Sequence, residues 1–379
     1  MMNTTRRSVK HMICAAVSIA LLGPCAAYAT QYSITPLGSL GGSDGTYSAG
    51  IDSAGAVIGY SYLSGNTYEN AVLYSNGSLQ DIIPTNERSR AIAISPTGAI
   101  TGWAFDSTGL QAQAYLYSNG VYTANIGGLG GEFSAGIGIN NNGEIVGVNM
   151  PNGVDTAFAY TPGGTTQQLG TFGGTTSFAQ GVNSSGQVVG YATDSSGNAL
   201  AFLYSNGAMQ NLGTLGGATS TANAINTSGI VVGQADNAAG NGQAFVYSNG
   251  QMSDLGSLGG LTSNATALND ANQIVGSATN AAGSSEAFLY SNGTMQNLNS
   301  LIGVSSSLYT LQSATGINSN GQISVNGVVN ATGENMAFLL TPVTSTASAG
   351  VPAPATAGLL LLSVLALWGA ERRRRVHLG

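Results

Sequence analysis

The central part of this 379-residue sequence contains almost no side chains that carry acid–base, nucleophilic or redox chemistry. Between residues 30 and 350 there is no histidine, no cysteine and no lysine. Ser-His-Asp and Cys-His catalysis need histidine, and the common zinc sites need histidine or cysteine. Schiff-base catalysis and Walker-type phosphate loops need lysine. The sequence therefore excludes these classes of site, and we expect neither a cofactor nor a metal.

Positive charge is equally scarce in this part of the chain. Arg88 and Arg90 are its only cationic residues, against fifteen aspartates and glutamates, so its formal charge is −13. Proteins that bind nucleic acids neutralise phosphates with a basic surface. The composition therefore predicts that nucleic acid is not a partner.

The N-terminal segment, residues 1–29, has the pattern of a secretory signal peptide. A basic start precedes a short apolar run over residues 12–22, and Ala27 and Ala29 form a small-x-small cleavage site. The apolar run is too short for a membrane-spanning helix. We therefore expect signal peptidase to cleave the chain after Ala29.

The C-terminal segment, residues 351–379, has three parts in a fixed order. Val351, Pro352 and Pro354 belong to the motif Val-Pro-Ala-Pro, and an uncharged apolar stretch follows over residues 355–370. As a helix this stretch is about 24 Å long, and snorkelling arginines extend its reach across a bilayer core of about 30 Å. Positive charges stay on the cytoplasmic side, so the rest of the chain is expected outside. The basic cluster consists of Arg372, Arg373, Arg374 and Arg375.

This order resembles the PEP-CTERM sorting signal of Gram-negative bacteria, whose usual motif is Val-Pro-Glu-Pro. The resemblance implies recognition by an exosortase and a transient anchor in the inner membrane through the C-terminal transmembrane helix. It also implies that the protein ends at the cell surface or in the extracellular matrix. An ordinary single-pass tail anchor is the alternative. Residues 344–350 are expected to link this signal to the preceding domain.

Residues 30–343 contain one sequence unit written seven times. The motif Leu-Gly-x-(Leu/Phe)-Gly-Gly begins at residues 37, 169, 212 and 255, and the last three starts are spaced by 43. Asn-x-x-Gly turns or their variants, and Ser-Asn-Gly turns in five copies, divide the copies into four short strands each, which is typical of an all-β fold. An Ala-aromatic-x-Tyr motif or a variant marks every copy, beginning at Ala71, Ala114, Ala157, Ala201, Ala244, Ala287 and Ala337.

The two ends of the repeat region are out of phase. Residues 32–38 match the fourth strand of the other copies, whereas the last copy stops after residues 337–340 without a fourth strand. If residues 34–37 pair with residues 337–340, the chain closes into a ring with no open edge. The sequence therefore predicts a seven-bladed β-propeller, with an open β-solenoid as the alternative. The repeats resemble the HAF family of bacterial extracellular repeats over roughly residues 37–340, although the histidine of the His-Ala-Phe triplet is absent here.

One repeat position carries a large aromatic residue in three copies. It follows the glycine of the second strand and holds Tyr60, Trp103 and Tyr191, whereas other copies have small, aliphatic or amide side chains there. Aromatic rings on a surface of low charge can stack on sugar rings. We interpret these three residues as candidate glycan-stacking positions. The alternative is that they fill gaps between blades of unequal size.

Taken together, the sequence predicts an exported, non-enzymatic, monomeric repeat protein that binds or scaffolds extracellular polysaccharide. One alternative is a carbohydrate-active enzyme that uses acids alone, for which Glu132, Glu144 and Asp155 are the candidate residues. The other is a passive surface protein whose acidic face provides solubility and repels anionic neighbours.

Overall fold

The computed structural model describes residues 30–65, 68–83, 88–126 and 131–343. The predicted signal peptide, the linker and the C-terminal sorting signal lie outside these residues, and so does the predicted transmembrane helix. In the part described, none of the helices has the length and apolar character needed to cross a bilayer.

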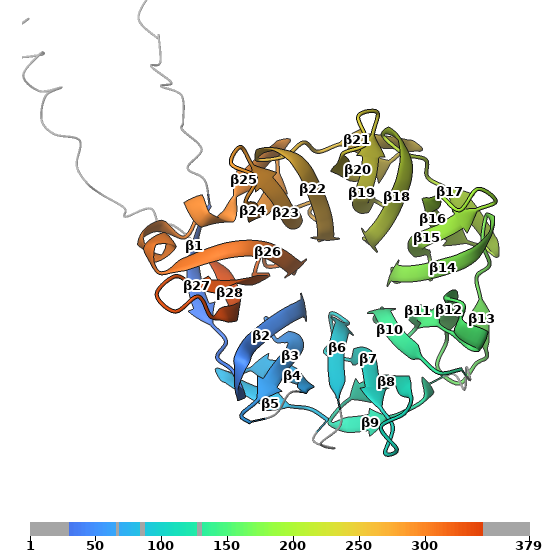
Figure 1. The fold of residues 1–379 in the computed structure, drawn as a ribbon, viewed down its shortest axis with the longest axis horizontal. Helices are drawn as coiled ribbons and strands as arrows, with labels where there is room; N and C mark the ends of the chain where they lie inside the picture. The colour runs from blue at the N-terminus through green and yellow to red at the C-terminus, as the bar shows by residue number, and fades with distance from the viewer. Residues whose placement is uncertain (1–29, 66–67, 84–87, 127–130, 344–379) are drawn as a thin grey trace, which may run out of the picture.

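The described chain forms seven four-stranded antiparallel sheets arranged as the blades of a ring, which confirms the seven-bladed β-propeller (Figure 1). From the inner to the outer strand, blades 1 to 3 are β2 (Gly41–Ile51), β3 (Val57–Leu63), β4 (Glu69–Ser75), β5 (Ser78–Asp81); β6 (Ser89–Ile94), β7 (Ile100–Phe105), β8 (Ala112–Ser118), β9 (Val121–Thr123); β10 (Ser134–Ile139), β11 (Ile145–Asn149), β12 (Thr156–Tyr160), β13 (Thr166–Gln168). Blades 4 to 6 are β14 (Gly173–Val182), β15 (Val188–Asp194), β16 (Ala199–Ser205), β17 (Ala208–Asn211); β18 (Gly216–Ile225), β19 (Val231–Asn237), β20 (Gly242–Ser248), β21 (Gln251–Asp254); β22 (Gly259–Leu268), β23 (Ile274–Asn280), β24 (Ser285–Ser291), β25 (Thr294–Asn297). Blade 7 is β26 (Tyr309–Ile317), β27 (Ile323–Val329), β28 (Asn335–Val343) and β1 (Gln31–Pro36), and the short 3₁₀ turns are η2 (Pro151–Gly153), η3 (Leu298–Ser300) and η4 (Gly303–Ser307).

The ring closes through the first strand, as the phase of the repeats predicts. Strand β1 is the outer strand of blade 7 and pairs antiparallel with β28, so that Ile34 lies opposite Leu340. The backbone N–H of Leu37 also donates to the carbonyl of Ala337 at 3.0 Å. Figure 1 shows β1 in the same blade as β26, β27 and β28. This closure rules out the open β-solenoid.

The core lies between neighbouring blades and is built from the repeated motifs. In one cluster, Val189 and Ala201 of blade 4 pack against Ala222 and Phe245 of blade 5. Each blade therefore buries its apolar faces against both neighbours, which no single copy can do alone. The aromatic residue of the Ala-aromatic-x-Tyr motif is fully buried at Tyr115, Phe158, Phe202, Phe245, Phe288 and Phe338.

In blades 1 to 6, the glycine of the second strand that lies opposite the buried aromatic residue of the third strand, or Val72 in blade 1, is required by a close approach of two backbones. A Cβ atom at Gly59 would lie 1.8 Å from the carbonyl oxygen of Tyr47, and one at Gly190 would lie 1.9 Å from that of Phe178. Any larger residue would therefore separate the first and second strands of the blade. The turns follow the predicted chemistry too, because Asn272 adopts a φ of +59° where other copies use glycine.

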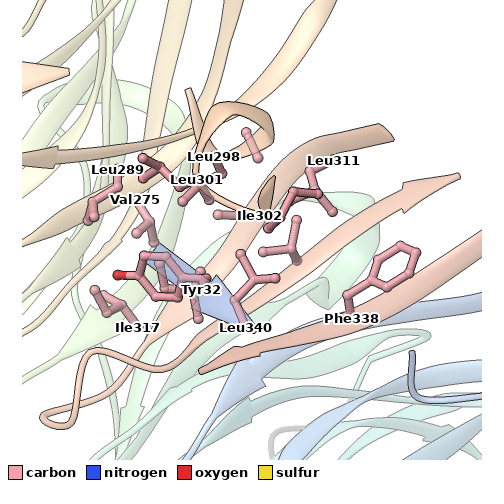
Figure 2. Close-up of a cluster of buried hydrophobic side chains, with 14 residues drawn as sticks. Tyr32, Val275, Leu289, Leu298, Leu301, Ile302, Leu311, Ile317, Phe338 and Leu340 are labelled. Atoms are coloured by element: carbon pink, nitrogen blue, oxygen red, sulfur yellow. The ribbon is translucent and has the colours of Figure 1, made fainter. Parts of the chain in front are cut away.

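The interval from Ala287 to Ala337 is 50 residues, seven longer than the 43-residue spacing, and it contains η3 and η4, which pack beside the closing strand. The side chain of Tyr32 on β1 is only 5% exposed and lies among Leu301, Ile302 and Leu340 (Figure 2). Its backbone N–H donates to the carbonyl of Leu301 at 2.9 Å. Burial raises the pKa of the Tyr32 hydroxyl to about 12. The insertion thus helps to hold β1 in the ring.

We predict that Tyr32→Ala lowers the free energy of unfolding by about 3 kcal/mol, because the substitution empties a buried aromatic site. Thr35→Ala on the exposed side of the same strand is the matched control and should change stability by less than about 0.5 kcal/mol. Chemical denaturation measures both values. Equal, small effects of the two substitutions would contradict the docking of β1.

Candidate binding site

Two of the three predicted stacking residues lie in one cluster at the junction of blades 1 and 2. Tyr60 on β3 and Trp103 on β7 are each half-buried. Arg90 on β6 connects them, because its guanidinium carbon lies 4.2 Å from the centre of the Tyr60 ring and 5.7 Å from that of Trp103. Arg90 also lies directly opposite Trp103 in the strand pairing. We call these residues, together with Glu69, Tyr68, Arg88 and Phe105, the arginine–aromatic cluster.

A buried carboxylate anchors the two arginines of this cluster. Oε1 of Glu69 accepts from Nη2 of Arg88 at 3.0 Å and from Nε of Arg90 at 3.1 Å. The Glu69 side chain is only 2% exposed at the start of β4. A buried charge is costly unless an opposite charge and hydrogen bonds compensate it. The ion pairs therefore fix both arginines across the boundary between the blades.

Aromatic rings hold the guanidinium groups on their other sides. Besides the Arg90 contacts, the guanidinium carbon of Arg88 lies 5.9 Å from the ring centre of Tyr68 and 5.8 Å from that of Phe105. Such cation–π contacts favour a guanidinium over the face of a ring. The orientation of each guanidinium group is thus limited by two rings and one carboxylate.

Tyr60 is engaged by other aromatic residues as well as by Arg90. The rings of Tyr60 and Tyr47 stack at 5.0 Å with an angle of 19°, and Tyr62 lies 6.2 Å away edge-on. Burial raises the pKa of the Tyr60 hydroxyl, although the positive charge of Arg90 acts in the opposite direction. Since its ring already has these partners, Tyr60 contributes to the site chiefly by supporting Arg90.

The cluster is partly open to solvent. The side chains of Arg88 and Arg90 are 44% and 36% exposed, and Tyr68 is 46% exposed. Within the described residues, Nη1 and Nη2 of Arg90 and Nε and Nη1 of Arg88 form no hydrogen bond. The site therefore presents several unused N–H donors beside aromatic rings, which is the kind of surface that polar ligands with apolar faces can use.

Tyr191, the third predicted residue, lies apart from this cluster in blade 4. Its ring stacks on that of Phe178 at 5.6 Å with an angle of 4°. Burial raises the pKa of the Tyr191 hydroxyl, and the nearby negative charge of Asp155 adds to the shift. The three aromatic positions are thus equivalent in the repeat but do not form one surface.

Of the three candidate acids of the enzyme alternative, Glu144 accepts a hydrogen bond through its carboxylate from the side chain of Asn140 in its own turn. Glu132 is exposed, and the hydrogen bond of Asp155 with the N–H of Ser177 involves its backbone carbonyl. The part of the chain that the structure describes has no group of three or more His, Cys, Asp or Glu residues able to hold a metal.

Apart from the arginine–aromatic cluster, a hollow lies on the propeller axis, at the end formed by the Asn-x-x-Gly turns and their variants. Its volume is about 470 Å³, and every blade contributes to its lining. Around the hollow, the asparagine side chain of one turn donates to the backbone carbonyl of the equivalent turn in the next blade. Five such hydrogen bonds, with N···O distances of 2.9–3.4 Å, run from the turn of Asn140 in blade 3 to the turn of Asp52 in blade 1. Oδ1 of Asp52 accepts from the N–H groups of Ala54 and Ala56, so this side chain stabilises its own turn. The hydrogen bonds explain why asparagine recurs there.

Sequence reasoning singled out Tyr60 and Trp103 as candidates but not Glu69, Arg88 and Arg90, which the structure places beside them. A signal was present, since the only two cations of the central region stand two residues apart. Alternate residues of a strand share one face of a sheet, so both side chains could have been expected to act together.

No protein-family model and no curated protein matches the chain. Three similar solved structures are TolB from Acinetobacter baumannii (12% identity, 77% of this chain and 64% of that chain, TM-score 0.45), a mutant of the Aleuria aurantia lectin in complex with alpha-methyl-L-fucoside (9%, 71% and 96%, 0.36) and the Trypanosoma rangeli sialidase in complex with the inhibitor DANA (11%, 91% and 58%, 0.37). This chain therefore spans less than two thirds of the length of TolB. At these identities the similarity concerns the fold alone.

We predict that replacing both arginines, as Arg88→Gln with Arg90→Gln, lowers the free energy of unfolding by about 3 kcal/mol. The reason is that Glu69 would remain buried without a partner. Adding Glu69→Gln should restore most of the loss, because no buried charge then remains. Denaturant titrations of the two variants measure the difference. A triple variant no more stable than the double variant would contradict this role of Glu69.

Proposed function

We propose that this protein is an exported, non-enzymatic component of the cell surface or extracellular matrix that binds or scaffolds polysaccharide. The observation that carries the proposal is the arginine–aromatic cluster. It combines unused guanidinium donors with aromatic side chains at the junction of two blades. Sugars offer hydroxyl groups to such donors and C–H faces to such rings. A rigid propeller supports a site of this kind without any moving part.

The proposed location follows from the two terminal segments. A signal peptide ending at Ala29 would direct export, and the PEP-CTERM-like tail would present the chain to an exosortase in the inner membrane. Membrane-anchored at first, the protein would then reach the cell surface or matrix of a Gram-negative bacterium. Extracellular polysaccharide is an abundant partner at that location.

The proposed lack of catalysis rests on composition. Residues 30–350 contain no histidine, cysteine or lysine, so an enzyme would have to work with carboxylates alone. A glycosidase of that type needs two carboxyl groups on opposite sides of one bond. Two acids, Asp52 and Asp270, line the axial hollow. Oδ1 of Asp52 accepts a hydrogen bond from Ala54, and Oδ1 of Asp270 accepts hydrogen bonds from Thr227, so both carboxylates stabilise the turns. We therefore favour binding over hydrolysis.

We expect the mature protein to bind polysaccharide extracted from its host's envelope, measured by affinity electrophoresis. Replacing Tyr60, Trp103 and Tyr191 together by alanine should weaken binding at least about tenfold, equivalent to about 1.4 kcal/mol. Trp103→Ala alone should cause most of that loss because Trp103 lies in the arginine–aromatic cluster. Tyr191→Ala is the matched comparison at the equivalent position of blade 4.

No binding to any polysaccharide of a broad bacterial panel would contradict the proposed function. Unchanged binding by the variant with all three alanines would remove Tyr60, Trp103 and Tyr191 from the binding site. If no ligand changes the thermal stability of the protein either, the passive acidic surface protein becomes the better interpretation. Release of reducing sugar during incubation would instead favour the enzyme alternative.

A further inference from the structure

The arginine–aromatic cluster contains more positive charge than its buried carboxylate requires. One guanidinium group would balance Glu69, yet both Arg88 and Arg90 contact the same oxygen, Oε1. Together the three side chains have a formal charge of +1. These are also the only two cationic residues between residues 30 and 350. Neutralisation of Glu69 therefore accounts for one arginine and leaves the second unexplained.

The free donors of the two arginines have the geometry that a carboxylate uses. Arg90 contacts Glu69 through Nε, which leaves both terminal nitrogens for a ligand, and Arg88 uses only Nη2. A planar guanidinium group offers two parallel N–H donors that match the two oxygens of a carboxylate. The rings of Tyr60 and Trp103 already restrict the orientation of Arg90, so little freedom is lost when a ligand binds.

The rest of the protein favours a local rather than a general attraction for anions. Outside the cluster, the central region contains acids but no cations, so its field repels polyanions that do not fit the site. Exposed Tyr68 and half-buried Trp103 lie next to the guanidinium groups and can contact an apolar sugar face. A ligand that combines one carboxylate with a sugar ring therefore suits the site.

We propose that the arginine–aromatic cluster binds the carboxylate of an acidic sugar, of the uronic acid class, within a polysaccharide. This inference rests on the proposed polysaccharide binding and adds the chemical class of the ligand. The carboxylate accepts hydrogen bonds from Arg88 and Arg90 and neutralises the remaining positive charge. The neighbouring aromatic side chains contact the ring of the same sugar.

The test compares three polymers with the mature protein in calorimetric titrations at about 0.15 M salt. The probes are polygalacturonate, the same polymer with its carboxyl groups reduced to alcohols, and dextran sulfate. We expect polygalacturonate to bind. The reduced polymer should bind about ten- to hundredfold more weakly, because it loses the hydrogen bonds between its carboxylates and the charged guanidinium groups. Dextran sulfate should also bind more weakly than polygalacturonate.

Two variants separate the binding role of the arginines from their structural role. Glu69→Gln removes the buried charge and retains both guanidinium groups, so it is the reference against which the loss of the arginines is measured. Glu69→Gln with Arg88→Gln and Arg90→Gln leaves no buried charge unpaired and should lose binding at least about tenfold. Thermal unfolding of both variants confirms that they are folded.

Each contrary outcome has a distinct meaning. Equal binding of the reduced polymer, still dependent on Trp103, overturns the acidic-sugar class and leaves polysaccharide binding intact. Equal or tighter binding of dextran sulfate shows a general attraction for polyanions and overturns the carboxylate claim. Full binding by the folded variant with Glu69, Arg88 and Arg90 all replaced by glutamine shows that the arginines are not part of the site. No binding to these polymers or to envelope polysaccharide overturns the proposed function as well.

Discussion

The pairing of β1 with β28 is the interaction on which the whole architecture depends. Each blade buries its apolar faces against two neighbours, so an incomplete last blade would expose core residues and a sheet edge. Strand β1 supplies the missing strand, and Leu37 just after it packs against Val57 of blade 1 and Ala337 of blade 7. Residues 37–40 join β1 directly to β2 of blade 1, so the pairing of β1 with β28 is the non-covalent contact that closes the ring.

A closed ring of similar blades leaves a few positions free to vary, and blades 1 and 2 differ from the others at several of them. Glu69, Arg88 and Arg90 create the arginine–aromatic cluster where these two blades meet. At the axial end of the same blades, Asp52 and Ser95 replace the asparagine of the other copies, and neither side chain can donate an amide N–H to the next turn. Blades 1 and 2 therefore differ from the rest at the axial turns as well as in the cluster.

The sequence predicted features that arise within one copy or from the phase of the copies. Turns, the second-strand glycine and the closing strand belong to this group, because local backbone geometry or simple counting determines them. The partners of the candidate residues were harder to foresee. A β-bulge shifts the register between the first and second strands, at Ser48/Gly50 and at Ala91/Ala93, so counting from the turn misplaces Arg90 relative to Trp103. The pairing of Arg90 with Glu69 spans two blades, and no repeat pattern encodes it.

The most direct test of the account is an engineered disulfide between β1 and β28. Ser33 lies opposite Thr341, and directly opposed residues of antiparallel strands lie within disulfide range. Residues 30–379 contain no cysteine, so Ser33→Cys with Thr341→Cys introduces the only thiols of the mature chain. Closure predicts that intact mass after mild oxidation shows the loss of two hydrogens and no alkylatable thiol in the folded monomer. Two thiols that stay free and react with an alkylating reagent, as in a control pairing Ser33→Cys with Ser195→Cys in blade 4, would contradict the closed ring.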